Sequence, residues 1–238
     1  MCDFLTTFVA FLSTIMAKTE SNINEVFQFL RLLAAHNERP WFKARKEQYD
    51  ALRQAWEHDI ERLINLVAQW DDKARGLTVR QAVYRIYRDI RFSPDKRPYK
   101  TYFSGVIGAG GRKCVSSGYY VHLEPGNSML CGGVWWPEKD KLAAIRGLID
   151  AEADEWLRLM ANPELTARYS LDESEALKTV PKGYPKDHPM ARYLRFKSFI
   201  FVKKLDESYF DCDDWVARVN DDLRPLKPVH DFLDYVFE

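Results

Sequence analysis

Residues 101–136 of the chain read TYFSGVIGAGGRKCVSSGYYVHLEPGNSMLCGGVWW, and this stretch decides the fold. Three runs rich in β-branched and aromatic residues, 101–107, 119–123 and 129–136, are separated by glycine-rich and Pro-Gly-Asn turn signals. Turns of this kind join antiparallel strands, because parallel neighbours need a crossover of a dozen or more residues. Two further runs, 83–92 and 198–202, have the same composition. The sequence therefore predicts an antiparallel sheet of four or five strands.

Helices are predicted on both sides of this stretch. Apolar residues recur at steps of three and four in residues 40–70 and 138–160, which is typical of helices with one buried face. Shorter helices are expected near residues 22–36 and around Trp215 and Phe232. We expect the two long helices to pack on one face of the sheet. The residues predicted to be buried there are Trp56, Ile60, Leu63, Val67, Leu142, Ile145 and Ile149.

Composition and length favour one globular domain. The chain has 238 residues, of which 46% are hydrophobic and 29% charged. No linker or internal repeat divides it, so we expect one α+β domain over residues 17–238. Residues 1–16 are apolar but shorter than a membrane span, and they lack the basic start of a signal peptide. We interpret them as an N-terminal extension, which leaves Met1 and Met16 as alternative starts. The four scattered cysteines favour the cytoplasm.

The net charge is zero, yet the charges are unevenly distributed along the chain. Residues 80–100 hold seven basic residues and two carboxylates, a net charge of +5. Residues 205–238 hold three basic residues and ten carboxylates, a net charge of −7. Either the two segments pair with each other across the fold, or the basic segment faces an anionic ligand. The sequence does not decide between these two arrangements.

The basic segment contains the densest group of candidate binding residues. Residues 85–100 read RIYRDIRFSPDKRPYK, and arginine presents a rigid set of donors that matches phosphate and carboxylate groups. Asp89 lies between arginines and is expected to stay ionised. An alternative is that the arginines form internal ion pairs that only stabilise the fold. The predicted ligand-binding residues are Arg85, Arg88, Arg91, Lys96, Tyr99 and Lys100.

This segment resembles the signature of an uncharacterised family, domain of unknown function 2461. The matching pattern is R-x-x-R-D-x-R-F-S-x-D-K-x-P-Y-K, and the resemblance extends over nearly everything after residue 22. Further matching runs are NERPWF at 37–42, YYVHLEP at 119–125, GGVWWP at 132–137, and PKGY with DHP at 181–189. The resemblance implies a cytoplasmic protein found mainly in bacteria, and it brings no catalytic residues with it.

A second group of candidates contains histidine. His122 and Glu124 are two residues apart on a predicted strand and therefore share a face. With Asp187 and His188 they could act in acid–base chemistry or hold a metal, but their spacing matches no established metal motif. We expect no metal and no cofactor. Residues 108–113 lack the phosphate-loop pattern and are better explained as a turn. The catalytic candidates are Asp89, His122 and Glu124.

Two hypotheses follow. In the first, the basic signature lines a pocket for an anionic, phosphate-bearing ligand, either a small molecule such as a nucleotide or a nucleic acid. In the second, the chain is a non-catalytic interaction or structural module, and its arginines form internal ion pairs. The sequence does not show whether the protein is an enzyme, nor does it show the oligomeric state. No membrane association is expected. Unpaired arginines in a concave site would favour the first hypothesis, and fully paired ones the second.

Overall fold

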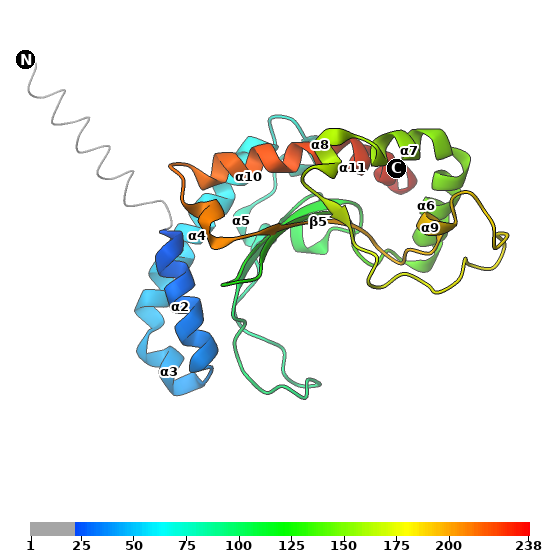
Figure 1. Cartoon of the computed structure of the whole chain (residues 1–238). Helices are drawn as coiled ribbons and strands as arrows, with labels where there is room; N and C mark the ends of the chain where they lie inside the picture. Colours follow the sequence, from blue (N-terminus) through cyan, green and yellow to red (C-terminus); the bar gives the residue numbers. More distant parts are fainter. Residues whose placement is uncertain (1–21) are drawn as a thin grey trace, which may run out of the picture.

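The centre of the fold is an antiparallel sheet of five strands, seen in a computed structural model that describes residues 22–238 (Figure 1). The strands lie in the order β1-β2-β3-β5-β4, and every neighbouring pair is antiparallel. This confirms the predicted α+β fold. The strands are β1 (Phe103–Ile107), β2 (Gly118–Leu123), β3 (Ser128–Val134), β4 (Ser170–Leu171) and β5 (Phe199–Leu205).

The helices account for most of the remaining chain. In Figure 1, α10 and α11 lie along one face of the sheet, while the other face is open toward the bottom of the view. The N-terminal helices form one end of the molecule. The helices are α2 (Ile23–Ala35), α3 (Arg39–Ala44), α4 (Lys46–Val67), α5 (Val79–Ala82), α6 (Lys139–Ala151), α7 (Ala153–Met160), α8 (Pro163–Thr166), α9 (Ala191–Leu194), α10 (Trp215–Leu223) and α11 (Lys227–Asp234).

Strand alternation separates the two faces of the sheet. One set of alternate residues, including Phe103, Tyr119 and Leu130, is buried against the helices. Glycine brings the helical layer unusually close at Gly132, where a Cβ atom would lie 2.6 Å from Leu226 Cδ1. The other set, including Tyr120 and His122, points to the open face. The same alternation therefore builds the core and leaves a second face that α10 and α11 do not cover.

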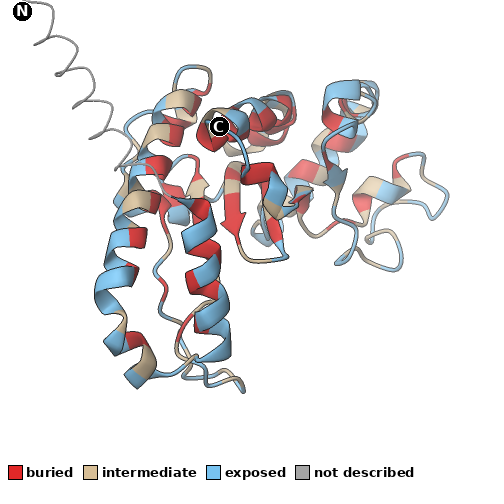
Figure 2. Cartoon of the chain, turned by 60° about the vertical axis from the view of Figure 1, so that its left-hand side comes forward, coloured by how far each residue is buried: buried red, intermediate tan, exposed pale blue. Residues whose placement is uncertain are grey.

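The core residues predicted on the helix over 40–70 are confirmed, although the structure divides this helix at Arg45 into α3 and α4. Trp56, Ile60, Leu63 and Val67 are all fully buried on α4. Figure 2 shows buried residues where the helices meet each other and the sheet, with exposed residues on their outer sides. This pattern is what the sequence periodicity predicts for an amphipathic helix.

The other long helix, predicted over 138–160, differs from its prediction in three ways. The helix expected over 138–160 is interrupted at Glu152, which separates α6 from α7. Ile145 and Ile149 are buried, but Leu142, in the first turn of α6, is only partly buried. Finally, α6 stands at the end of the sheet (Figure 1), where Arg146 donates a hydrogen bond of 2.7 Å to the Phe196 carbonyl.

The strand predicted over 83–92 is wrong. This segment makes only isolated bridges, Val83 with Gly105 and Tyr87 with Tyr99. Two backbone hydrogen bonds hold the base of the resulting loop, from Arg88 N to Pro98 O and from Lys100 N to Ile86 O. Aspartate side chains explain the difference, because Asp89 and Asp95 each accept a bond from the backbone N–H two residues later. Such local bonds compete with strand pairing and turn the chain.

Residues 1–16, interpreted as an N-terminal extension, lie outside the described residues. No helix within residues 22–238 is both long and apolar enough to cross a membrane.

Candidate functional site

The open face of the sheet is hollowed into a groove with a cavity volume of about 550 Å³. Alternate residues of β1, β2 and β3 form its floor. The segment around Tyr84 lies along β1, held by a hydrogen bond of 3.0 Å from Tyr84 N to Ser104 O, and forms one wall. We call this cavity the open-face groove. Its principal lining residues are Tyr84, Lys100, Tyr102, Ser104, Val106, Arg112, Cys114, Tyr120, His122, Met129, Cys131, Trp135 and Ile200.

A hydrogen-bonded chain of three side chains begins at the floor of the groove. The Tyr120 hydroxyl lies 3.0 Å from His122 Nδ1, and His122 Nε2 lies 3.1 Å from Glu124 Oε2. These residues are two apart, so strand alternation places all three on one face. An ionised carboxylate only accepts hydrogen bonds, so the neutral His122 ring carries its proton on Nε2. Its Nδ1 then accepts from the Tyr120 hydroxyl.

The protonation of this chain follows from its surroundings. Burial lowers the pKa of His122, and this outweighs the hydrogen bond to Glu124 that acts in the opposite direction. Burial alone would raise the pKa of Glu124, but hydrogen bonds from Asn127, His122 and Thr101 hold it below its usual value. The Asn127 and Thr101 bonds to Glu124 are each 2.8 Å long. The site therefore holds a neutral imidazole beside an ionised carboxylate.

Two cations line the groove and have no carboxylate within ion-pair distance among residues 22–238. The Lys100 ammonium lies 5.0 Å from the ring centre of Tyr84 and 5.6 Å from that of Tyr102. Burial lowers the pKa of Lys100, and the neighbouring Arg85 and Arg112 lower it further. Arg112 donates to two backbone carbonyls, those of Arg80 at 2.9 Å and Gln81 at 3.0 Å.

Glycine places Arg112 in this position. Gly111 adopts a φ of +60°, and a Cβ atom there would lie 2.6 Å from the Gln81 carbonyl oxygen. Only glycine permits such a close approach in this conformation. The glycine-rich run at 108–111 belongs to the connection between β1 and β2, as the turn interpretation predicts, but it also holds a cation at the wall of the groove.

Most of the predicted binding residues lie on a projecting loop rather than in the groove. Arg88 pairs with Asp95 at 2.7 Å, and Arg91 pairs with Asp89 at 2.6 Å. Hydrogen bonds from Arg91 lower the pKa of Asp89 to about 2. Asp95 also accepts from Arg97, so two arginines share one carboxylate. We call residues 85–99 the basic loop.

The remaining members of the predicted set have separate positions. Lys96 donates to the Ile90 carbonyl at 3.0 Å, and neither it nor Arg85 forms an ion pair in the described part of the chain. Tyr99 is buried and stacks on Phe42, with 4.0 Å between ring centres. Asn37 bonds both the N–H and the carbonyl of Tyr99, each at 3.0 Å. Of the six predicted ligand-binding residues, only Lys100 lines the groove.

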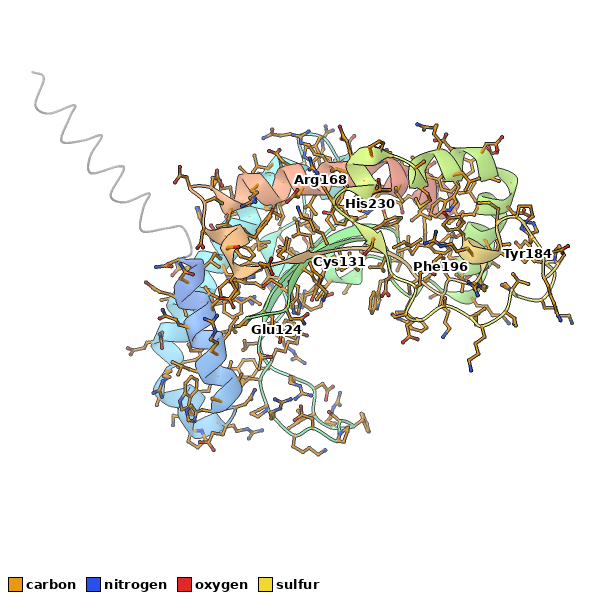
Figure 3. All side chains as sticks on the ribbon, viewed as in Figure 1. Glu124, Cys131, Arg168, Tyr184, Phe196 and His230 are labelled. Carbon is orange, nitrogen blue, oxygen red and sulfur yellow. The ribbon has the colours of Figure 1, made fainter. Side chains whose placement is uncertain are left out.

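The second histidine candidate is remote from this site. His188 pairs with Asp150 on α6 at 3.0 Å. In Figure 3, Tyr184, which contacts His188, lies at the end of the molecule opposite Glu124. Asp187 and His188 therefore do not join His122 and Glu124. Within residues 22–238, no group of three or more His, Cys, Asp or Glu side chains is arranged to hold a metal ion.

Sequence reasoning missed Arg112 and Tyr120 as site residues. Tyr120 precedes His122 by two residues, so the alternation that pairs His122 with Glu124 also predicts that Tyr120 shares their face. No comparable signal exists for Arg112. It reaches the groove only because the connection after β1 folds back onto the carbonyls of residues 80 and 81.

The structure also shows which ion pairs the residues of the two charged segments form. Arg88, Arg91 and Arg97 of the basic loop pair with Asp89 and Asp95 inside the same segment. Carboxylates of residues 205–238 instead pair with cations elsewhere, for example Asp222 with Lys203 at 2.5 Å and Asp234 with Lys73. No ion pair joins the two segments in the described structure.

Comparisons with known proteins give one match. The model of a protein family described as "Conserved hypothetical protein (DUF2461)" matches residues 25–232. No curated protein and no solved structure matches the chain. The family match covers most of the sequence, so the chain belongs to this family.

Proposed function

We propose that this DUF2461 protein binds an anionic, phosphate-bearing ligand in the open-face groove. One observation carries the proposal: Lys100 and Arg112 line a concave site without a carboxylate partner in the described structure. Removing a lysine from water without pairing it costs free energy. A fold keeps such an arrangement most readily where an anion completes it. Compared with the sequence-based hypothesis, the proposed contacts move from the arginines of the signature to Lys100 and Arg112.

The rest of the groove favours a ligand that also carries an apolar or aromatic part. Its floor includes Val106, Met129 and Ile200, and Trp135 lines it with 68% of its surface exposed. The volume of about 550 Å³ lies within the range of small-molecule sites. A nucleotide combines a planar ring with phosphate and fits both requirements. Tyr120, held by His122, supplies a hydroxyl at the floor of the groove that a bound ligand could contact.

The alternative, a structural or interaction role, is favoured for part of the signature. Arg88 and Arg91 already have carboxylate partners, so their guanidinium groups are engaged without any ligand. We therefore propose that these two arginines shape the basic loop, while Lys100 and Arg112 contact the ligand.

A thermal-shift experiment tests the binding proposal. The probes are sodium phosphate and AMP, with sodium chloride at equal ionic strength as the salt control. We expect both probes to raise the melting temperature of the wild type, since a ligand at 100 times its Kd stabilises a protein by about 2.7 kcal/mol. The variants Lys100→Met and Arg112→Met should lose this rise.

Arg91→Met is the matched control, because it removes an equally large cation that is paired outside the groove. It should retain the rise. If neither probe stabilises the wild type, or if the Lys100→Met and Arg112→Met variants respond like the wild type, the groove is not the anion site.

A further inference from the structure

The basic loop has features that the open-face groove does not explain. Phe92, near its tip, is 93% exposed, the largest exposure among the big apolar side chains of the described residues. Figure 1 shows the loop between α5 and β1 projecting from the open side of the sheet, away from α10 and α11. The Phe92 ring is therefore accessible to a partner on a loop that also carries several cations.

The charge of the loop points to an anionic partner. Residues 85–99 hold five basic residues and two carboxylates, a net charge of +3, and both carboxylates are bound to arginines of the same loop. Arg85 and Lys96 form no ion pair in the described part of the chain. The guanidinium carbon of Arg91, Cζ, lies 5.8 Å from the centre of the Phe92 ring. Cations beside an exposed ring are the combination that contacts both the phosphates and the bases of a nucleic acid.

Lys100 connects the basic loop to the groove, because it follows the loop directly in the sequence and lines the groove. Arg85 at the base of the loop is close enough to lower the pKa of Lys100. The carboxylate-rich segment 205–238 supplies α10 and α11, which lie on the opposite face of the sheet. The cations of the basic loop therefore lie away from the carboxylate-rich helices α10 and α11, where they would attract a polyanion.

The loop is also held in shape before any partner binds. Arg88 bonds both Asp95 at 2.7 Å and the Arg97 carbonyl at 3.1 Å, which links the two sides of the loop. Asn37 fixes its base through the backbone of Tyr99. A preorganised loop loses less conformational freedom on binding, and this favours affinity.

From these observations we propose that the protein binds single-stranded nucleic acid. The strand runs from the groove, where a phosphate contacts Lys100 and Arg112, onto the basic loop, where Arg85 and Lys96 contact phosphates and Phe92 stacks on a base. This inference rests on the proposed function of the groove and names its ligand. Single strands are favoured over duplexes because bases must be unpaired to stack on Phe92 and on the exposed Trp135.

Fluorescence anisotropy with labelled oligomers tests the proposal on the full chain. The probes are a 12-nucleotide oligothymidylate, the oligouridylate of equal length and a 12-base-pair DNA duplex. We expect both single strands to bind at low salt and the duplex to bind more weakly. Phe92→Ala should weaken single-strand binding about tenfold. The double variant Arg85→Met/Lys96→Met should flatten the salt dependence by roughly two phosphate contacts.

Matched controls separate this surface from general effects. Leu32→Ala removes an exposed apolar side chain on α2, and Arg158→Met removes an exposed cation on α7. Both should bind like the wild type. Because Phe92 and Arg85 are exposed, the loop variants should keep the wild-type melting temperature and its rise in phosphate, whereas Lys100→Met should lose both phosphate stabilisation and strand binding.

The outcomes distinguish the two proposals. Phosphate stabilisation without oligomer binding would overturn this inference and leave the groove proposal intact. Equal binding of duplex and single strands, or single-strand binding that is unaffected by Phe92→Ala or by Lys100→Met, would also overturn it. If neither phosphate nor oligomers bind, both proposals are wrong.

Discussion

Arg88 and Arg91 belong to the same signature, but their surroundings differ. The Arg88 side chain is 25% exposed and donates hydrogen bonds to a carboxylate and a backbone carbonyl. The Arg91 side chain is 76% exposed, and its carboxylate partner is Asp89, two residues earlier in the chain. Hydrogen bonds to partly buried charged groups contribute more to stability than exposed ion pairs do. The two arginines should therefore respond differently to the same substitution.

We predict that Arg88→Met lowers the free energy of unfolding by about 1–2 kcal/mol, because it leaves Asp95 and the Arg97 carbonyl with fewer partners. Arg91→Met should leave it nearly unchanged, because exposed ion pairs contribute little to stability. Urea denaturation of both variants measures the difference. Equal losses would show that the loop is not organised by Arg88.

Lys100 is partly removed from water and lies near Arg85 and Arg112, so its charge destabilises the free protein. We predict that Lys100→Met unfolds at the same or a higher urea concentration than the wild type at pH 7.5. The folded-state pKa is lowered, so the unfolded chain holds this proton more tightly, and the cost disappears as the pH rises toward 10.5. The advantage of the variant should shrink over that range. A clear loss of stability at pH 7.5 would contradict the prediction.

At the scale of elements, β3 and β5 approach each other closely at a glycine. Gly133 has a φ of +128°, and a Cβ atom there would lie 1.8 Å from the Phe199 carbonyl oxygen. The next residues, Val134 and Trp135, lead to Trp136, which is the only described residue other than glycine with positive φ, at 45°. The end of β3 therefore depends on a backbone path that ordinary side chains disfavour.

We predict that Gly133→Ala destabilises the protein by more than about 3 kcal/mol, because β3 and β5 must separate to admit the methyl group. Gly147→Ala is the matched control. Gly147 lies within α6, and a Cβ atom there would meet nothing within 4 Å, so the same change should stabilise by about 0.5–1 kcal/mol. Thermal unfolding of both variants provides the comparison, and a mild effect at Gly133 would refute it.

At the scale of the whole molecule, His230 joins the two layers of the fold. It lies on α11 above the sheet (Figure 3), and its ring centre is 4.3 Å from that of Tyr119 on β2. Complete burial lowers the pKa of His230 to about 3, and the nearby Asp71 only partly opposes this. His122 is also shifted downward by burial, so the folded protein keeps two histidines neutral.

The unfolded chain binds protons at these histidines below about pH 6.5, whereas the folded protein does not. The stability that they contribute is therefore present above pH 6.5 and is lost as the pH falls toward 3. We predict that the free energy of unfolding falls across this range and that His230→Leu reduces the slope. His58→Leu, at an exposed position on α4, is the control and should leave the slope unchanged. An identical slope in His230→Leu would exclude His230 as the cause.

The sequence by itself determined strands β1, β2, β3 and β5, the antiparallel arrangement and the buried stripe of α4, because alternation, turn residues and helical periodicity are local signals. It did not predict the two-residue strand β4, which pairs with β5 only through the tertiary structure. It also showed that only Asp89 and Asp95 were close enough along the chain to neutralise the signature arginines, and these are the partners observed. It failed over residues 83–92, where backbone N–H groups donate to Asp89 and, just beyond the segment, to Asp95, and these local bonds outweighed a high strand propensity.

The groove was decided by the tertiary structure. Tyr84, Lys100, Arg112 and Tyr120 lie far apart in the sequence, and they meet because β1 pairs with β2 while the flanking segments fold along β1. Such long-range packing decides whether a cation lies beside a carboxylate and how far burial removes it from water. The sequence could therefore show that cations are concentrated in residues 80–100, but only the folded chain separates the arginines that are paired from the lysine that is not.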